Sequence, residues 1–126
     1  MITGRVSSDG LNLRPIVELP VCVENGPAVP IEAIVDTGFT GYLTLSREMT
    51  ELLALEPVSD QVMTLADGSR ALFLVYRAVV EWFGTLRQID VHRAEGDSLV
   101  GMAMLQNHNL QIQAIHGRDV SITPIC

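Results

Sequence analysis

The chain consists largely of short stretches in which apolar residues alternate with polar ones, separated by dipeptides that favour tight turns. In residues 17–23 every second residue is valine or leucine, which is the period of a strand with one buried face. Asn-Gly at 25–26 and Asp-Gly at 67–68 tolerate the positive φ angles of hairpin turns, and Gly84 marks a third turn. This pattern predicts an all-β fold built from hairpins.

The same pattern places the individual elements. We expect paired strands at residues 17–23 with 31–36, 61–66 with 69–80 and 78–82 with 86–92, and further strands at 42–45, 110–115 and 120–125. Two segments have helical spacing, residues 46–55, with Ser46 as N-cap and Pro57 as a stop, and residues 102–107. About eight or nine strands with one or two short helices predict a small β-barrel. No linker or repeat divides residues 1–126, so we expect one domain.

Composition excludes several classes of function. The 15 acidic and 8 basic residues give a net charge of -7, whereas binding to a phosphate backbone needs clustered Lys and Arg. We therefore expect no nucleic-acid partner. No stretch reaches the roughly 18 to 20 consecutive apolar residues that span a bilayer, and the N-terminus lacks a basic segment followed by an apolar run. We expect a soluble, unprocessed, cytoplasmic protein without a membrane partner.

The cysteines and histidines do not form a metal-binding pattern. Cys22, in a predicted strand, and Cys126 are too few for a disulfide framework and are interpreted as a buried and a terminal thiol. His92, His108 and His116 have no zinc-type spacing, so we interpret them as surface or loop histidines. No metal and no cofactor is expected.

The segment with the strongest chemical signal is Asp36-Thr37-Gly38, which ends an apolar run. A carboxylate at the inner end of a strand is costly unless it is hydrogen-bonded or shares a proton. Gly38 lets the backbone approach the carboxylate, and the Thr37 hydroxyl can bond across a symmetry axis. A bare triplet of this kind is usually an ordinary turn. Here, however, a second glycine follows it, and residues 98–101 repeat the pattern of two apolar residues and a glycine before a short helix.

With these segments the chain resembles the retropepsin-like aspartic peptidases, specifically their single-domain bacterial relatives. The resemblance covers most of the chain and includes the Asp36 triplet, a flap-like hairpin at residues 65–68 and the closing residues 99–101 with their helix. It implies a small closed retropepsin-like barrel assembled as a two-fold dimer. It also implies the following roles: Asp36 is catalytic, Thr37, Gly38, Leu99, Val100 and Gly101 support the catalytic loop, and Ala66, Asp67 and Gly68 bind the substrate from the flap.

The implied chemistry needs two carboxylates, one ionised to accept a proton from water and one protonated to polarise the scissile carbonyl. The chain has a single Asp-Thr-Gly, so a complete pair requires two copies related by a two-fold axis. The expected function is that of a homodimeric aspartic endopeptidase that hydrolyses a peptide or protein substrate through a water activated by paired Asp36 carboxylates.

Two positions depart from the family pattern and keep other functions open. Phe39 stands where relatives have Ala or Ser after the triplet, and Ala103 stands where they often have Asp or Asn. A catalytically silent module for dimerisation or peptide binding is therefore the alternative, and a β-barrel ligand-binding protein unrelated to peptidases is a third reading. Residues 67–68 could also be a plain exposed hairpin tip. Three aromatic residues are interpreted as core rather than pocket residues: Tyr76, Trp82 and Phe83.

Overall fold

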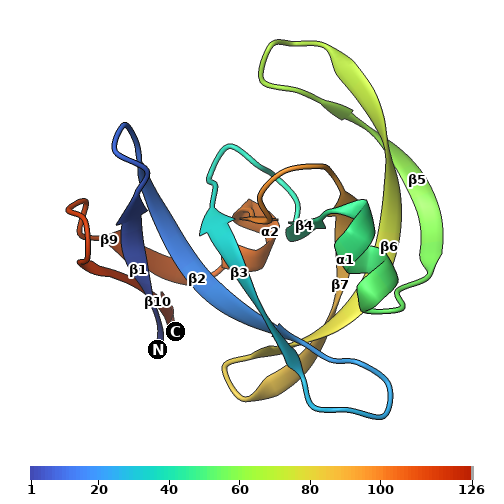
Figure 1. Cartoon of the computed structure of the whole chain (residues 1–126), viewed down its shortest axis with the longest axis horizontal. Coiled ribbons are helices and arrows are strands. Elements are labelled where there is room, and N and C mark those ends of the chain that lie inside the picture. Colours follow the sequence, from blue (N-terminus) through green and yellow to red (C-terminus); the bar gives the residue numbers. More distant parts are fainter. Residues whose placement is uncertain (126) are drawn as a thin grey trace.

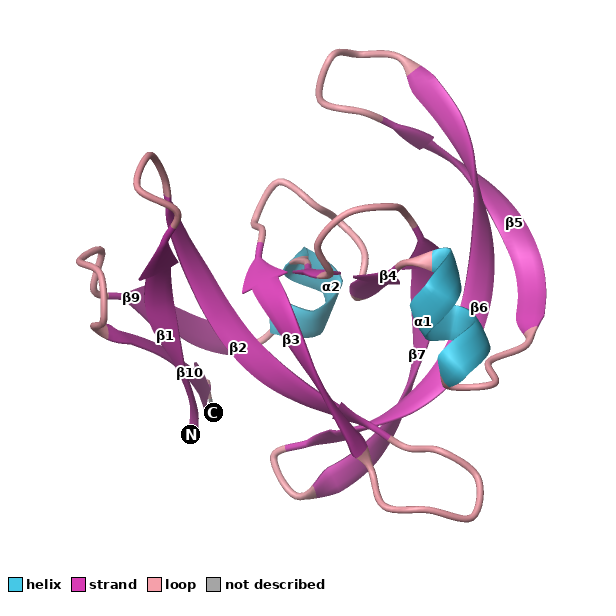
Figure 2. Ribbon diagram, in the orientation of Figure 1, coloured by secondary structure: helices cyan, strands magenta, loops and turns pink. Residues whose placement is uncertain are grey.

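The computed structural model describes residues 1–125, so that Cys126 lies outside the described residues. These residues form ten strands and two short helices (Figures 1 and 2). In chain order the elements are β1 (Ile2–Ser8), β2 (Leu13–Val21), β3 (Val29–Val35), β4 (Leu43–Leu45), α1 (Arg47–Leu52), β5 (Pro57–Thr64), β6 (Arg70–Trp82), β7 (Thr85–Arg93), β8 (Leu99–Val100), α2 (Met102–Leu105), β9 (His108–Ile112) and β10 (Asp119–Pro124).

The strands form one sheet that closes on itself. Their order is β5-β6-β7-β4-β8-β3-β2-β1-β10-β9, with an additional pairing between β6 and β2. Val21 of β2 pairs with Val80 of β6, and the Cys22 amide donates to the Val79 carbonyl at 2.8 Å. Strands β2, β3, β8, β4, β7 and β6 therefore make a closed barrel, from which the β5–β6 hairpin arches away (Figure 1). The predicted all-β barrel with short helices is confirmed.

The interior of the barrel is filled by the alternating apolar residues that the sequence pattern identified. Val17, Leu19 and Val21 of β2 are at most 1% exposed, and each such side chain contributes roughly 1.5–3 kcal/mol on burial. Tyr76 and Trp82 are also buried, which confirms their interpretation as core aromatics. Neither of the helices in residues 1–125 is long and apolar enough to span a membrane.

The turns differ in detail from the prediction. Phe83 and Gly84 both have positive φ, 52° and 77°, and form the expected two-residue turn. Residues 22–28 instead make a longer loop, in which Asn25 has a positive φ of 60° but Gly26 does not, whereas a two-residue turn of this type needs positive φ at both positions. Cys22 therefore lies outside a strand and is half-buried, contrary to the prediction.

Two further elements were predicted incompletely. Helix α1 is capped by Ser46, whose Oγ accepts from the Met49 amide at 3.2 Å, but it ends before residue 55 because Ala54 has a φ of 55°. Strand β1 was not predicted, since Gly4 interrupts its apolar pattern. A side chain at Gly4 would clash with the Ile16 backbone of β2, so the glycine permits a close approach of the two strands.

Candidate active site

Asp36 stands directly at the end of β3. Strand β3 runs parallel to β8, with Ile34 opposite Leu99 and Val35 opposite Val100. The Asp36 amide continues this ladder by donating to the Val100 carbonyl at 2.9 Å. Since Val35 and Val100 are buried in the core, the backbone of Asp36 has a fixed position at the mouth of the barrel.

The Asp36 side chain is half-buried and keeps one side open. Its Oδ1 accepts from the Gly38 amide at 2.9 Å, and the Phe39 amide donates to the Asp36 carbonyl at 3.1 Å. Within residues 1–125 the Gly38 amide is the one group that donates a hydrogen bond to this carboxylate. Thr37 is exposed. One chain therefore presents one carboxylate, with an unused oxygen and an accessible hydroxyl beside it.

The loop that carries Asp36 is held from behind by the start of α2. The Met102 amide donates to the Phe39 carbonyl at 2.8 Å, and the Ala103 amide donates to the Gly41 carbonyl at 3.1 Å. The first amides of a helix have no partner within the helix, so the loop carbonyls satisfy them. The Ala103 side chain adds no hydrogen bond of its own, so the backbone amides of α2 make this connection.

Gly101 makes this approach possible. A Cβ added at Gly101 would lie 2.5 Å from the Phe39 carbonyl oxygen and closer still to that of Gly41, so a residue with a side chain does not fit without displacement of the backbone. The Gly101 amide donates to the Tyr42 carbonyl at 3.1 Å. The structure therefore brings residues 99–101 against residues 36–42, although about 60 residues separate the two segments along the chain.

A cavity of 360 Å³ opens next to Asp36. The Asp36 loop forms one wall, the β5–β6 hairpin forms another, and the ends of β4, β7 and β8 complete it. It is lined by Asp36, Gly38, Phe39, Thr40, Thr44, Met63, Thr64, Leu65, Ala66, Phe73, His92, Ala94 and Leu99. A larger hollow of 510 Å³ lies beside the β6–β7 turn and includes neither Asp36 nor the tip of the hairpin.

Of the residues expected to bind substrate from the hairpin, Ala66 lines this cavity, whereas Asp67 and Gly68 do not. The turn is a three-residue loop rather than the expected two-residue turn. The Gly68 amide donates to the Leu65 carbonyl at 2.9 Å, and the Leu65 amide donates to the Ser69 carbonyl at 2.7 Å. With a φ of 85°, Gly68 supplies the positive φ that follows the turn in such loops.

Asp67 folds back onto its own turn. Its Oδ1 accepts from the Ser69 hydroxyl at 2.6 Å and from the Ser69 amide at 2.9 Å. The hydroxyl, followed by the amide, holds the pKa of the Asp67 carboxyl below its ordinary value of 3.8. In this structure Asp67 and Gly68 shape the hairpin tip.

The prediction of His92 as a surface or loop histidine is wrong. His92 lies in β7, is 5% exposed and points into the cavity beside Asp36. Its Nε2 is 2.8 Å from the Gln61 Oε1 of β5. Burial lowers the pKa of His92 below 6.5, against the opposing charge of Asp90.

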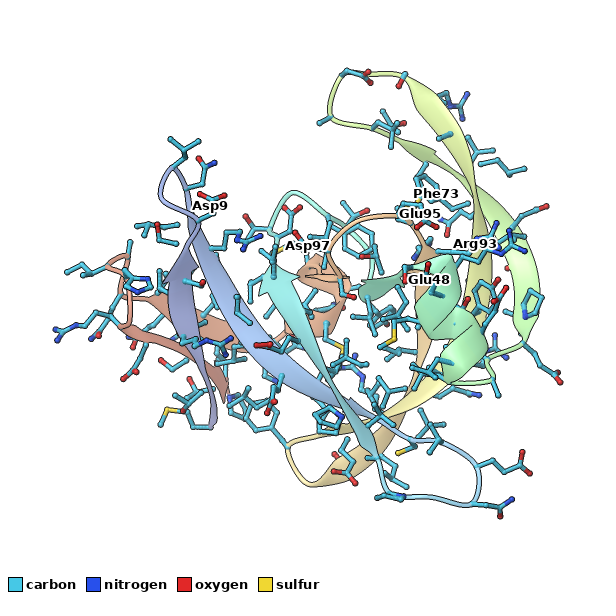
Figure 3. All side chains as sticks on the ribbon, viewed as in Figure 1. Asp9, Glu48, Phe73, Arg93, Glu95 and Asp97 are labelled. Atoms are coloured by element: carbon cyan, nitrogen blue, oxygen red, sulfur yellow. The ribbon has the colours of Figure 1, made fainter. Side chains whose placement is uncertain are left out.

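Sequence reasoning missed His92 because its burial comes from other elements. On the same face of β7, Gln88 and Asp90 are exposed, so the local pattern predicts an exposed residue at 92 as well. The hairpin and the Asp36 loop cover this face only at its end. Phe73 was likewise not identified, and Figure 3 shows it on the side of the hairpin that faces the barrel. Among residues 1–125 no three His, Cys, Asp or Glu side chains gather as metal ligands.

The fold is similar to that of solved structures. A retropepsin-like aspartic protease from Rickettsia conorii aligns with a TM-score of 0.57 and 18% identity, over 97% of this chain and 90% of that one. EIAV protease in complex with the inhibitor HBY-793 aligns with a TM-score of 0.53 and 15% identity, over 79% of this chain and 91% of that one. Neither a protein-family model nor a curated protein sequence matches the chain.

Proposed function

Since the chain has a retropepsin-like fold, we propose that it is a homodimeric aspartic endopeptidase in which Asp36 of each subunit supplies one carboxylate. The observation that carries the proposal is the position of Asp36. Its backbone is fixed by β8 and the Gly38 amide binds one oxygen, while the rest of the carboxylate borders a cavity that the β5–β6 hairpin covers. A carboxylate with a fixed position and an open side is suited to act on a bound water.

The mechanism requires the second copy. Two close carboxylates cannot both stay ionised, so the pair shares one proton. The ionised member accepts a proton from water, and the protonated member donates a hydrogen bond to the scissile carbonyl. Thr37 is exposed next to Asp36, where its hydroxyl can bond to the partner loop across the two-fold axis. Residues 99–101 hold each loop from behind.

The substrate is an extended peptide that lies between the hairpin and the Asp36 loop. Such a segment is recognised through backbone hydrogen bonds, and pockets for alternate side chains give specificity. The cavity walls contributed by Phe39, Met63, Leu65 and Phe73 suit an apolar side chain of the peptide. Ala66 at the hairpin tip is close enough to border the same space.

Phe39 favours one alternative, a catalytically silent module that binds peptides or dimerises. A Ser at this position would offer a hydroxyl to the carboxylate, whereas Phe39 offers none, and within residues 1–125 the Gly38 amide is left as the donor to Asp36. The Phe39 ring lies edge-on to His92, with centroids 5.8 Å apart, and occupies part of the cavity wall. A module that binds a peptide without hydrolysing it would need the cavity but no further donor to Asp36.

Replacement of Asp36 separates the two functions. Asp36→Asn keeps the size of the side chain and removes its ionisable proton, so we expect hydrolysis of a peptide mixture to fall by about 10²- to 10⁴-fold, the contribution of a positioned acid or base. The wild type should cleave best at mildly acidic pH, because turnover needs a singly protonated pair. The matched control is Asp60→Asn, on an exposed position of β5, which should retain wild-type activity. Equal cleavage by the wild type and Asp36→Asn would contradict the proposal, and a wild type that cleaves nothing supports the silent module.

A complete site also predicts the oligomeric state. Sedimentation over a dilution series should show a dimer at the concentrations of the activity assay, and specific activity should fall as the dimer dissociates. Asp36→Asn should remain dimeric, since it relieves a like-charge pair. A monomer with undiminished activity at all concentrations would rule out the shared carboxylate pair.

A further inference from the structure

His92 touches both parts of the candidate site at once. From β7 its Nε2 reaches Gln61 of β5 at 2.8 Å. Its ring lies edge-on to Phe73 of β6, with centroids 6.5 Å apart, and edge-on to Phe39 of the Asp36 loop at 5.8 Å. Both arms of the hairpin therefore meet the loop through this one side chain. Gln61 and Phe73 lie opposite each other in the hairpin, so their side chains share its inner face.

The contacts of the ring suit its neutral form. The Gln61 Oε1 is an acceptor, so His92 donates from Nε2 and its Nδ1 carries a lone pair. This Nδ1 is buried and has no partner within residues 1–125. In the protonated ring, Nδ1 would instead be a charged donor without an acceptor, which is far more costly to bury than a lone pair.

The surrounding charges are few. Asp36 lines the same cavity. Asp90 lies on the same face of β7, two residues away, and is paired with Arg77 of β6, with 3.9 Å between Oδ1 and Nε. The cavity residues from β4, β5 and β6 are uncharged: Thr44, Met63, Thr64 and Phe73. Burial outweighs the Asp90 charge, so the pKa of His92 lies below 6.5.

We infer that His92 is a positioning residue whose neutral ring holds the inner face of the β5–β6 hairpin against the Asp36 loop. The inference rests on the proposed function, because the hairpin covers a substrate only if the site binds one. It deepens that function by assigning the side chain that keeps the hairpin closed. The contacts themselves do not depend on whether the site hydrolyses peptides.

The direction of the pH effect follows from linkage. Opening of the hairpin exposes His92 to water and restores its ordinary pKa of about 6.5, whereas the closed form holds a lower pKa. Protons therefore bind the open form more tightly. The neutral ring therefore stabilises the closed form in full above about pH 6.5. This stabilisation decreases as the pH falls below that value towards the pKa that His92 has in the closed form.

Methyl NMR of the intact protein tests this without turnover. The methyl group of Met63 lies in the cavity wall on β5, and that of Met104 lies in the core at 0% exposure. From pH 8 to pH 4.5 we expect the Met63 methyl order parameter of the wild type to fall with the titration of His92, while that of Met104 stays constant. Gln61→Leu, at an exposed position, should lower the order of Met63 at every pH without loss of the fold.

Three variants identify the titrating group. His92→Gln keeps a neutral hydrogen-bonding side chain, so the pH dependence of Met63 should disappear. His116→Gln, at an exposed loop position, should behave as the wild type. Asp36→Asn should keep the pH dependence, because His92 is intact. An unchanged pH response of Met63 in His92→Gln, or its loss in Asp36→Asn, would overturn the inference. Absence of peptide cleavage would overturn the proposed function alone.

Discussion

The Asp36 loop and the tip of the β5–β6 hairpin border the same cavity, but their hydrogen bonds reach over very different distances along the chain. Residues 36–42 bond to residues 100–103, which come from β8 and the start of α2. At the hairpin tip, residues 65–69 bond only to one another in the described chain. Most of β5 is exposed, whereas β4, next to the Asp36 loop, is buried throughout.

This difference separates two requirements of a site of this kind. In the proposed dimer the Asp36 carboxylate must meet its symmetry mate, which needs a fixed backbone, and long-range hydrogen bonds backed by the core provide it. A segment that covers an extended peptide must open and close, so it is drawn from the part of the fold with few buried contacts. In this chain the conformation of the Asp36 loop depends on the whole barrel, whereas the conformation of the hairpin tip, residues 65–69, can change while the barrel stays intact.

The largest effect is expected from a methyl group added next to the Asp36 loop. Gly101→Ala places a Cβ against the carbonyl oxygens of Phe39 and Gly41, and neither backbone group can move without breaking its bonds to α2. We expect the free energy of unfolding to fall by about 3 kcal/mol or more. Chemical denaturation would measure the loss.

The matched change in the hairpin is Gly68→Ala. A Cβ there meets nothing within 4 Å, and the cost comes from the φ of 85° alone, which is about 1 to 2 kcal/mol for an L-residue. Equal losses in the two variants would mean that the two regions do not differ in rigidity.

How far the sequence predicts these regions depends on the range of the interactions involved. The hairpins follow from alternation and turn residues, which are local. Asp36 has a local signal, a carboxylate at the end of an apolar strand, whereas its contact with residues 99–101 is implied only by the resemblance, because no periodicity shows that two segments so far apart will meet. The burial of His92 depends on three elements at once and has no local signal. Strand β1 was missed for a local reason. Gly4 weakens the strand pattern in the sequence, yet the close approach of β1 to the Ile16 backbone of β2 requires a glycine at this position.

A side-chain tie behind the loop gives a smaller effect. The Oγ1 of Thr44, which is 5% exposed, accepts from the Leu99 amide at 2.8 Å and so joins β4 to β8. Thr44→Val keeps the shape but leaves this amide without an acceptor, which should cost about 1–3 kcal/mol. Thr44→Ser should restore most of the loss, and Thr40→Val, at an exposed position, should change stability by less than about 0.5 kcal/mol. A loss in Thr44→Val no greater than that in Thr40→Val would show that the bond does not support the loop.

The smallest effect is expected from a change at the hairpin tip, and this effect should be confined to residues 65–69. Asp67→Ala removes the acceptor of the Ser69 hydroxyl and amide, so the Ser69 amide should exchange faster with solvent, while the midpoint of thermal unfolding stays unchanged. Because the ionised carboxylate makes these bonds, the pKa of Asp67 lies below 3.8, and the protection of Ser69 in the wild type should be complete above that pH and decline as the pH falls through the lowered pKa. Asp67→Asn keeps an acceptor without the charge and should give the Ser69 amide an intermediate protection factor that does not change in this pH range. Hydrogen exchange followed by NMR measures all three proteins. If Asp67→Ala also lowers the unfolding midpoint, the tip is coupled to the barrel, and the proposed independence of residues 65–69 from the barrel is wrong.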